Sequence, residues 1–311
     1  MQASYSSKSY ITSSTTVRSR SNGYPTPSSF LSPRSNDPLP SSRAIHRSRP
    51  VYSPPPLRRH HSHLLMALPN STSPRGDLTE LDTAVDFEAV ASPDGYISIC
   101  GFGSLLSEKS ARSTFPDLKN FRVGVLRGFR RVFAHVAPIF FDRGIANEET
   151  GEVSSLSVEP CEGEYLLVTV FEIKKEEVPS FIERENEFRF LAVIPEELDG
   201  SPFPNPAVVC ARYSDEEYFQ VRCQGSKEIF FQNYGRYNIH KIWRDDILPC
   251  RIYLRHCVLA AKNLGNLAYD NFLDHTYISD RRTTIREYLA SAGSGIMEEE
   301  PPDSLKSRYG G

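Results

Sequence analysis

The sequence predicts an α+β fold, with a mixed β-sheet that is curved or closed into a small barrel, flanking helices and a helical C-terminal third. Three observations predict this class. Strand-like segments fill the first two thirds of the region after residue 95, and helical patterns fill the last third. Strands followed by helices are typical of α+β domains. The chain has 311 residues, of which 39% are hydrophobic, so it can bury a sizeable core in one or two domains.

The strands are expected from their hydrophobic patterns. A short apolar run opens the series, and a longer segment with alternating apolar and polar side chains follows it. The third segment, "YLLVTVFEI", is a continuous apolar run rich in β-branched residues, and its short length indicates a buried strand rather than a helix. Two further apolar segments complete the set. The five segments are residues 97–102, 121–136, 165–173, 188–194 and 207–213.

Helices are expected where the spacing of apolar residues changes from that of strands to that of helices. Residues 174–186 are a charged connection, in which Pro179 suits a helix start, so the helix is expected over 180–186. Residues 249–265 begin with proline, carry apolar side chains on one face and end in glycine. Beyond them, Thr284 and Glu287 stand at the spacing of a capping box, which predicts a second helix start.

Charge divides the chain into two unequal parts. Residues 1–70 hold nine Lys or Arg and one acidic residue, a charge of about +8. The whole chain carries −3, so residues 71–311 carry about −11. An acidic folded part argues against a nucleic-acid partner.

The first seventy residues are rich in Ser, Arg and Pro and lack a hydrophobic period. This composition predicts disorder and is typical of an organelle transit peptide; a disordered tail without targeting function is the alternative. The serine content favours a chloroplast over a mitochondrion, while a start at Met66 would give a cytoplasmic form. The remaining chain is expected to comprise a linker (71–94), one domain (95–291) and a disordered tail (292–311).

Membrane and metal partners are not expected. No stretch approaches the roughly 18 apolar residues that a membrane span needs. The six cysteines form no C-x-x-C pair, and no histidine stands at zinc-like spacing to them. We therefore expect the cysteines to be reduced and mostly buried, as parts of the core.

The stretch "YISICGFGSLLSEKS", residues 96–110, interrupts an apolar strand with two glycines. Gly101 and Gly103 permit positive φ and a close backbone approach, so that successive N–H groups can converge on an anion. The alternative is a tight turn whose small residues serve packing. The stretch lacks the lysine of a phosphate-binding P-loop and the third glycine of a dinucleotide-binding motif.

The stretch "FIERENEFRF" places three carboxylates just before a strand, namely Glu183, Glu185 and Glu187. A carboxylate drawn over the end of a sheet loses water, and this raises its pKa toward the range that suits proton transfer. The alternative is a solvated charged face with Arg184 and Arg189 as ion-pair partners.

Together these stretches resemble the γ-glutamylcyclotransferase-like superfamily, whose first strand ends in Tyr-Gly-Ser-Leu. The later motifs follow in the family's order: "GFRRVF" at 128–133, Arg143-Gly144, and "FIERE" at 181–185. The C-terminal stretch "IYLRHCVLAAKNLG" is similar to the ChaC-type branch, which acts on glutathione. The resemblance covers roughly residues 96–290. The residues that match the family's first motif are Phe102, Gly103, Ser104 and Leu105.

The resemblance implies an enzyme that cyclises a γ-glutamyl group to 5-oxoproline and releases the attached amine. The substrate's own α-amine attacks its γ-carbonyl, so no metal, cofactor or protein nucleophile is implied. Glu185 would be the general acid/base, while Glu183 and Glu187 would be solvated neighbours. The backbone at 102–105 would bind the substrate.

Two departures from the family pattern leave rival functions open. Phe102 and Phe188 stand where the family has tyrosines, and phenylalanine donates no hydrogen bond. Residues 214–246 have no counterpart in the short ChaC pattern, although Tyr234 or Tyr237 in this segment is a candidate source of a missing hydroxyl. A non-catalytic relative that binds a small ligand or a protein, and a cyclotransferase of γ-glutamyl-amines, remain as alternatives.

Overall fold

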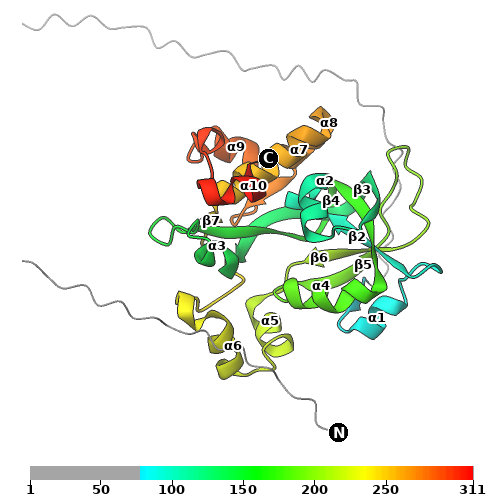
Figure 1. Cartoon of the computed structure of the whole chain (residues 1–311). Coiled ribbons are helices and arrows are strands. Elements are labelled where there is room, and N and C mark those ends of the chain that lie inside the picture. Colours follow the sequence, from blue (N-terminus) through cyan, green and yellow to red (C-terminus); the bar gives the residue numbers. More distant parts are fainter. Residues whose placement is uncertain (1–77, 311) are drawn as a thin grey trace, which may run out of the picture. The chain divides into compact units, whose positions relative to one another are not determined.

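The computed structural model describes residues 78–310. The segment predicted to be a transit peptide therefore lies outside the described residues. The described part forms one mixed sheet with helices on both faces (Figure 1), which confirms the α+β class. The strands are β1 (Thr79–Leu81), β2 (Tyr96–Gly101), β3 (Lys119–Val136), β4 (Glu152–Lys174), β5 (Arg189–Val193), β6 (Ala207–Ala211), β7 (Leu248–Pro249) and β8 (Thr276–Ile278).

The sheet order is β1-β5-β6-β2-β4-β3-β8, with β7 added beside β4. β2 and β6 run parallel, and β5 is antiparallel to β6. One further pairing, Val158 with Ala211, joins β4 to β6. The sheet is mixed and mostly open, so the small barrel that the sequence suggested is not confirmed.

The helices that cover the sheet differ in length, and α7 is the longest of those described. They are α1 (Ala84–Glu88), α2 (Glu108–Thr114), α3 (Pro138–Asp142), α4 (Val178–Arg184), α5 (Asp215–Val221), α6 (Lys227–Tyr234), α7 (Arg251–Leu264), α8 (Asn266–Asp274), α9 (Ile285–Leu289) and α10 (Lys306–Tyr309). The predicted helix starts are confirmed at Pro179, which lies in the first turn of α4, and at Thr284, which caps α9 with Glu287. Among these described residues, no helix combines the length and apolar character that a membrane crossing requires.

Side chains of the central strands alternate between two cores. Val168 and Val170 of β4 pack toward α7 and α8, while Phe171 and Ile173 pack toward α1, α2 and α4. Because helices cover both faces, this part of β4 is mostly apolar on both of its sides, as its sequence pattern predicted. All six cysteines are free, and four of them are buried.

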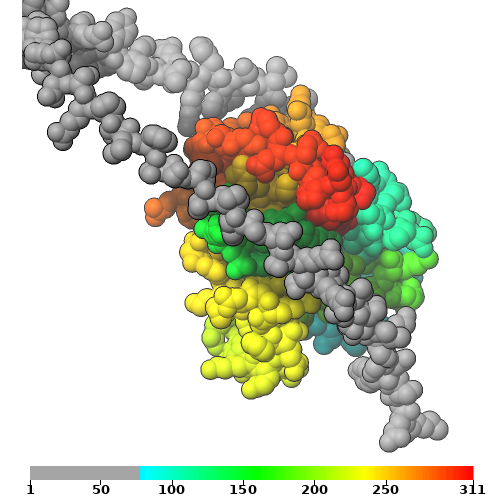
Figure 2. Space-filling model, turned by 60° about the vertical axis from the view of Figure 1, so that its left-hand side comes forward, coloured from blue at the N-terminus to red at the C-terminus, as the bar shows by residue number. Residues whose placement is uncertain are grey.

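A third core belongs to the segment 214–246, which forms α5, α6 and the short helix η3 (Gly235–Tyr237). Its tyrosines and Trp243 pack around Phe188 and Tyr213. In Figure 2 the yellow surface of this segment and the red surface of the C-terminal residues lie on opposite sides of green surface from the middle of the chain. The segment is thus an aromatic helical layer rather than an exposed loop.

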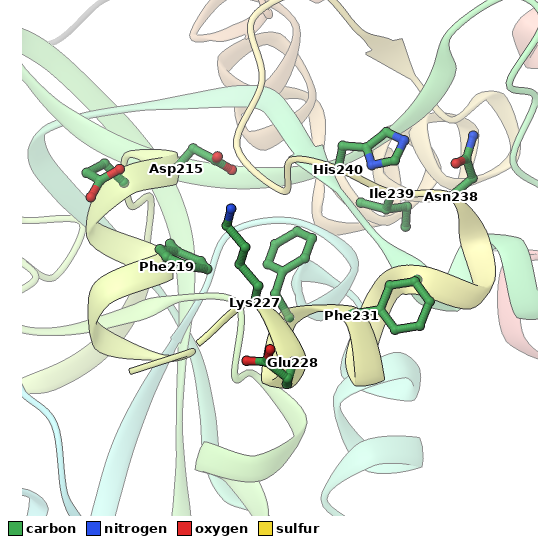
Figure 3. A pocket seen from close by; sticks show the side chains of 11 residues that line it. Asp215, Phe219, Lys227, Glu228, Phe231, Asn238, Ile239 and His240 are labelled. Atoms are coloured by element: carbon green, nitrogen blue, oxygen red, sulfur yellow. The ribbon is translucent and has the colours of Figure 1, made fainter. Parts of the chain in front are cut away.

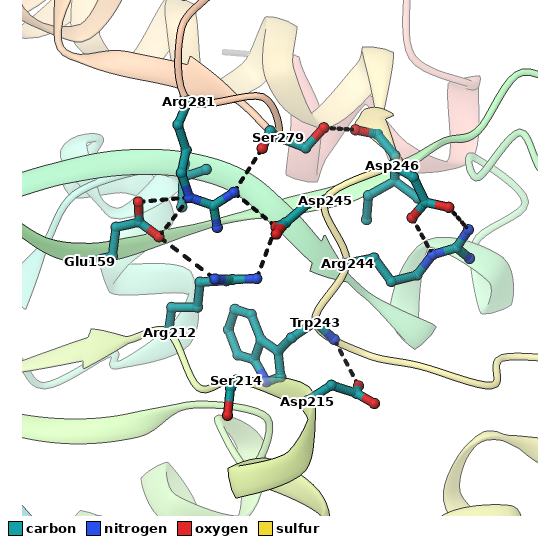
Figure 4. A network of polar contacts seen from close by, with 12 residues as sticks. Glu159, Arg212, Ser214, Asp215, Trp243, Arg244, Asp245, Asp246, Ser279 and Arg281 are labelled. Atoms are coloured by element: carbon teal, nitrogen blue, oxygen red, sulfur yellow. Dashed lines mark hydrogen bonds and ion pairs between the residues drawn. The ribbon is translucent and has the colours of Figure 1, made fainter.

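A network of ion pairs holds this segment to the sheet (Figure 4). Arg212, directly after β6, bonds Asp245 at 2.9 Å, and Arg281 bonds both Asp245 at 2.8 Å and Glu159 at 2.9 Å. Asp215 of α5 accepts hydrogen bonds from the backbone amides of residues 242 and 243, at 3.0 and 3.3 Å. Side chains from three stretches outside the segment, at residues 159, 212 and 281, and the internal contacts of Asp215 therefore fix the segment in place.

Two predicted boundaries differ from the structure. Part of the expected linker is structured: β1 pairs with β5, and Phe87 of α1 is buried. The expected disordered tail is also folded, since it forms two short 3-10 helices and α10, with Ile296 and Tyr309 buried. The sequence did not predict these folded stretches, because their low complexity includes only a few apolar side chains that anchor them.

Candidate functional site

Side chains from the protein interior pack closely against the glycine turn at the end of β2. Neither Gly101 nor Gly103 has positive φ, contrary to the expectation from sequence. A Cβ atom at Gly101 would lie 2.7 Å from Thr169 Oγ1 and 2.8 Å from Leu105 Cβ. At Gly103 it would lie 3.1 Å from Leu156 and 3.3 Å from the hydroxyl of Tyr253. Close contact with neighbouring side chains thus explains both glycines.

The backbone after this turn forms a short 3-10 helix, η1 (Ser104–Leu106), which leads into α2. The amides of Leu106 and Ser107 donate back to the carbonyls of Gly103 and Ser104, at 3.0 and 3.2 Å. The amides of residues 103–105 precede them and, as the first amides of a helical turn, have no acceptor within it. These are the N–H groups that the sequence indicated as a ligand cradle.

A buried guanidinium stands behind the turn. Arg131 of β3 is fully buried, and its Nε donates to the carbonyl oxygen of Phe102 at 2.7 Å. Its other nitrogens donate to Leu167 O and to Asn271 Oδ1. Burial lowers the pKa of Arg131 to about 9, so the side chain stays charged at neutral pH. The arginine of "GFRRVF" therefore positions the first motif and adds positive potential beside it.

Helix α7 places a phenol against the same turn. The hydroxyl of Tyr253 lies among the side chains of Ser104, Ser155 and Cys257, and burial raises the pKa of Tyr253 well above its usual value. The group is therefore a protonated hydrogen-bond donor at any physiological pH. Sequence reasoning missed it, because only the packing of α7 on the turn brings residue 253 to residue 103.

The three predicted carboxylates have three different environments. Glu183 is exposed, as the sequence suggested. Glu185 caps the C-terminal end of α4 and pairs with the guanidinium of Arg184 at 3.0 Å, with 27% of its side chain exposed. Glu187 is the most desolvated of the three and does not behave as a solvated neighbour.

Burial and the charge of Glu185 raise the pKa of Glu187 to about 7. Tyr234 of α6 donates a hydrogen bond to Glu187 Oε1 at 3.4 Å, and the hydroxyls of Tyr234 and Tyr218 are hydrogen-bonded to each other. The expectation that Glu187 is solvated was wrong because α5 and α6 cover it. Tyr234, which the sequence indicated as a source of a hydroxyl, indeed lies at the carboxyl segment.

Sheet topology brings the turn and the carboxyl segment to one edge. β5 begins at Arg189, opposite Ala211 at the end of β6, and β2 ends at Gly101 on the other side of β6. Neighbouring strands lie about 4.8 Å apart, so the two motifs emerge about 10 Å from each other. Cys210 of β6, the strand between β2 and β5, lies near this segment, and burial and the charge of Glu185 raise the pKa of its thiol.

A cavity of about 720 Å³ lies elsewhere, lined by residues of α5, of α6 and of the stretch 235–240 that follows α6 (Figure 3). Its walls combine apolar side chains with charged ones, among them Lys227 and Asp215. The residues that line it are Asp215, Glu216, Phe219, Lys227, Glu228, Phe230, Phe231, Gly235, Asn238, Ile239 and His240. None of the sequence-predicted site residues is among them. Within residues 78–310, no group of His, Cys, Asp and Glu side chains is arranged to hold a metal ion.

Comparison with known proteins gives structural matches only. No family model matches the chain, and no curated protein matches its sequence. A solved structure described as a γ-glutamyl cyclotransferase matches with a TM-score of 0.31 and 16% identity, over 49% of this chain and 90% of that one.

Two further solved structures are an uncharacterized protein from Homo sapiens and a protein from Arabidopsis thaliana. The first has a TM-score of 0.31 and 16% identity, over 49% of this chain and 90% of that one. The second has a TM-score of 0.29 and 13% identity, over 48% of this chain and 97% of that one. The chain is thus similar to these proteins over about half of its length, and any functional assignment rests on its own residues.

Proposed function

We propose that the protein is an enzyme of the γ-glutamylcyclotransferase type, which closes a γ-glutamyl group into 5-oxoproline and releases the attached amine. The observation that carries the proposal is a carboxyl pair, Glu185 and Glu187, at the sheet edge that also holds the glycine turn. Their environments differ, and carboxyl groups with separated environments are typical of an acid and base pair.

The two carboxyl groups divide the proton transfers between them. Glu185, ion-paired with Arg184, accepts a proton from the substrate's α-ammonium group. The freed amine attacks the γ-carbonyl carbon, so that a C–N bond forms and the bond to the leaving nitrogen breaks. Glu187, protonated near neutral pH, donates to the leaving nitrogen. The second proton of the new ring nitrogen returns to Glu187, and Glu185 passes its proton to the departing amine.

The turn binds the charged head of the substrate in this proposal. The amides of residues 103–105 and the hydroxyl of Ser104 donate to a carboxylate or to the developing oxyanion. The guanidinium of Arg131, which fixes the carbonyl of Phe102, favours negative charge at the same place. Holding both reacting ends of one molecule supplies most of the catalysis in such a cyclisation.

A non-catalytic relative that binds a small ligand is the second candidate, and one observation favours it. Phe102 is buried in the core against α7, and Phe188 in the aromatic layer, so neither offers a hydroxyl to a substrate. The same experiment identifies the substrate among glutathione, other γ-glutamyl peptides and γ-glutamyl-amines.

The test is to incubate the full chain with glutathione, γ-glutamyl dipeptides and a γ-glutamyl-amine, and to measure 5-oxoproline. We expect turnover, and a loss of about 10²–10⁴ in rate in Glu185→Gln and in Glu187→Gln. Glu183→Gln is the matched control from the same segment and should retain the rate. Binding without turnover in the unmutated chain would favour the non-catalytic candidate.

A further inference from the structure

Two polar groups are missing from the site at Phe102 and Phe188, and two others stand close to these positions. Tyr253 brings its hydroxyl to the turn beside Phe102. The imidazole of His135 lies against Phe188, with a ring-centroid distance of 4.8 Å and near-perpendicular ring planes. Neither group is explained by the proposed roles of the turn and the carboxyl pair.

His135 is buried without a hydrogen-bond partner. Only 3% of the residue is exposed, and neither Nδ1 nor Nε2 has a partner among the described residues. Its ring also stacks on Trp243 at 4.8 Å, and the Trp243 Nε1–H is buried and unpaired as well. Unpaired buried polar groups cost folding free energy, and a ligand that formed hydrogen bonds with both would recover that cost. Burial lowers the pKa of His135 to about 3, so the ring is neutral and has one donor and one acceptor nitrogen.

Ser155 connects this ring to the glycine turn. It is the direct cross-strand partner of His135, in the pairing of β3 with β4. It is also one of the side chains around the hydroxyl of Tyr253, together with Ser104 of the turn. Phe188, whose ring contacts that of His135, directly follows Glu187 in the chain. These contacts link the turn to the carboxyl segment through Tyr253, Ser155 and His135.

We propose that His135, Ser155 and Tyr253 form the polar wall of a binding site for the α-amino-acid head of a γ-glutamyl compound. The inference rests on the proposed function and names the residues that replace the two missing hydroxyls. Tyr253 donates a hydrogen bond to the carboxylate end, beside the amides of the turn. Neutral His135 accepts a hydrogen bond from the amine end with its unprotonated nitrogen, next to the carboxyl pair that takes the proton.

The experiment compares phenylalanine variants of the full chain. Binding of glutathione and of γ-glutamylglycine is measured by calorimetry, folding by the melting temperature, and turnover by 5-oxoproline. Trp243 is the only tryptophan of the chain and stacks on His135, so its emission should change when either compound binds the unmutated protein. An emission that stays constant while calorimetry detects binding would place the ligand elsewhere and overturn the proposal.

We expect His135→Phe to weaken binding at least tenfold while its melting temperature stays level or rises, because the variant removes unpaired polar atoms and keeps a ring. Tyr253→Phe removes one oxygen and should weaken binding likewise. His256→Phe is the matched control: His256 is equally buried and its Nδ1 is also unpaired, but its Nε2 lies 3.1 Å from Ser110 Oγ and its ring packs on Tyr309. This variant should lower the melting temperature and leave binding intact.

The possible results test the proposed polar wall and the proposed cyclisation separately. Unchanged binding in both a folded His135→Phe and Tyr253→Phe overturns the wall, while turnover in the unmutated chain leaves the reaction standing. Should His135→Phe not fold, Tyr253→Phe alone decides by the same criterion. Binding that both variants weaken, without turnover in the unmutated chain, supports the wall and removes the reaction. No binding of either compound to the unmutated chain overturns both.

Discussion

At the scale of single residues, the buried carboxyl of Glu187 makes stability depend on pH. Its pKa is raised from 4.5 to about 7 by burial and by Glu185, with Tyr234 as its hydrogen-bond donor. The unfolded chain therefore ionises at this position before the folded protein does. The contribution of Glu187 to stability is therefore full below pH 4.5 and falls as pH rises to about 7, by up to about 3 kcal/mol.

We expect Glu187→Gln to lack this fall, because glutamine has no proton to lose. The measurement is the free energy of unfolding in urea at several pH values, compared between the variant and the unmutated chain. Glu183→Gln, which changes an exposed carboxyl of the same segment, should keep the original profile. Parallel profiles for Glu187→Gln and the unmutated chain would mean that Glu187 is solvated.

Local motifs can be read from the sequence residue by residue, whereas burial that distant residues produce cannot. The turn at 101–105 and the carboxyls at 183–187 were recognisable as short stretches. The burial of Glu187 depends on Tyr234, 47 positions further along the chain, and the role of Tyr253 depends on how α7 packs. Neither contact leaves a signal in the spacing of nearby residues.

At the scale of elements, the contacts that fix the α5–α6 segment also keep Glu187 buried. Asp215 accepts hydrogen bonds from the backbone amides of residues 242 and 243. These amides would lose their acceptor in Asp215→Ala. An unpaired buried amide costs about 1–3 kcal/mol. We expect the variant to unfold at lower urea and to shift the emission of Trp243 to longer wavelength.

Glu216→Ala serves as the control for this element, since it changes an exposed acid of the same helix and should alter stability by less than about 0.5 kcal/mol. Equal effects of the two substitutions would show that the amide contacts of Asp215 do not hold the segment.

Elements with a clear period were predicted well, and others were missed for physical reasons. The N-terminal half of β4 carries Ser154 and Ser157, which the hydrophobic pattern does not mark as buried. Both are fully buried because their hydroxyls donate to the carbonyls of Leu248 and Val132. The helices α5 and α6 were missed because their aromatic residues serve a separate core and do not follow one helical face.

At the scale of the whole molecule, the C-terminal residues belong to the folded domain. Tyr309 is buried and receives a hydrogen bond from Arg143, and Arg251 pairs with Glu299. We expect a chain that ends at residue 292 to melt at a lower temperature and to be cut faster by trypsin, because it exposes the side chains that Ile296 and Tyr309 cover. A chain that ends at residue 309 should behave like the full chain. If the shorter chain is equally stable, the tail contributes nothing to folding.

The most direct test of the central claim is the pH dependence of 5-oxoproline formation from a γ-glutamyl compound. Glu187 faces Glu185, Tyr234 and the linked Tyr218, and in the proposed reaction it must hold its proton to release the leaving amine. We expect kcat/KM of the unmutated chain to decline above about pH 7, and Glu187→Gln to be slow at every pH without that decline. A profile that keeps the same decline in Glu187→Gln, or no 5-oxoproline from any γ-glutamyl compound, would contradict the claim that this carboxyl pair performs the cyclisation.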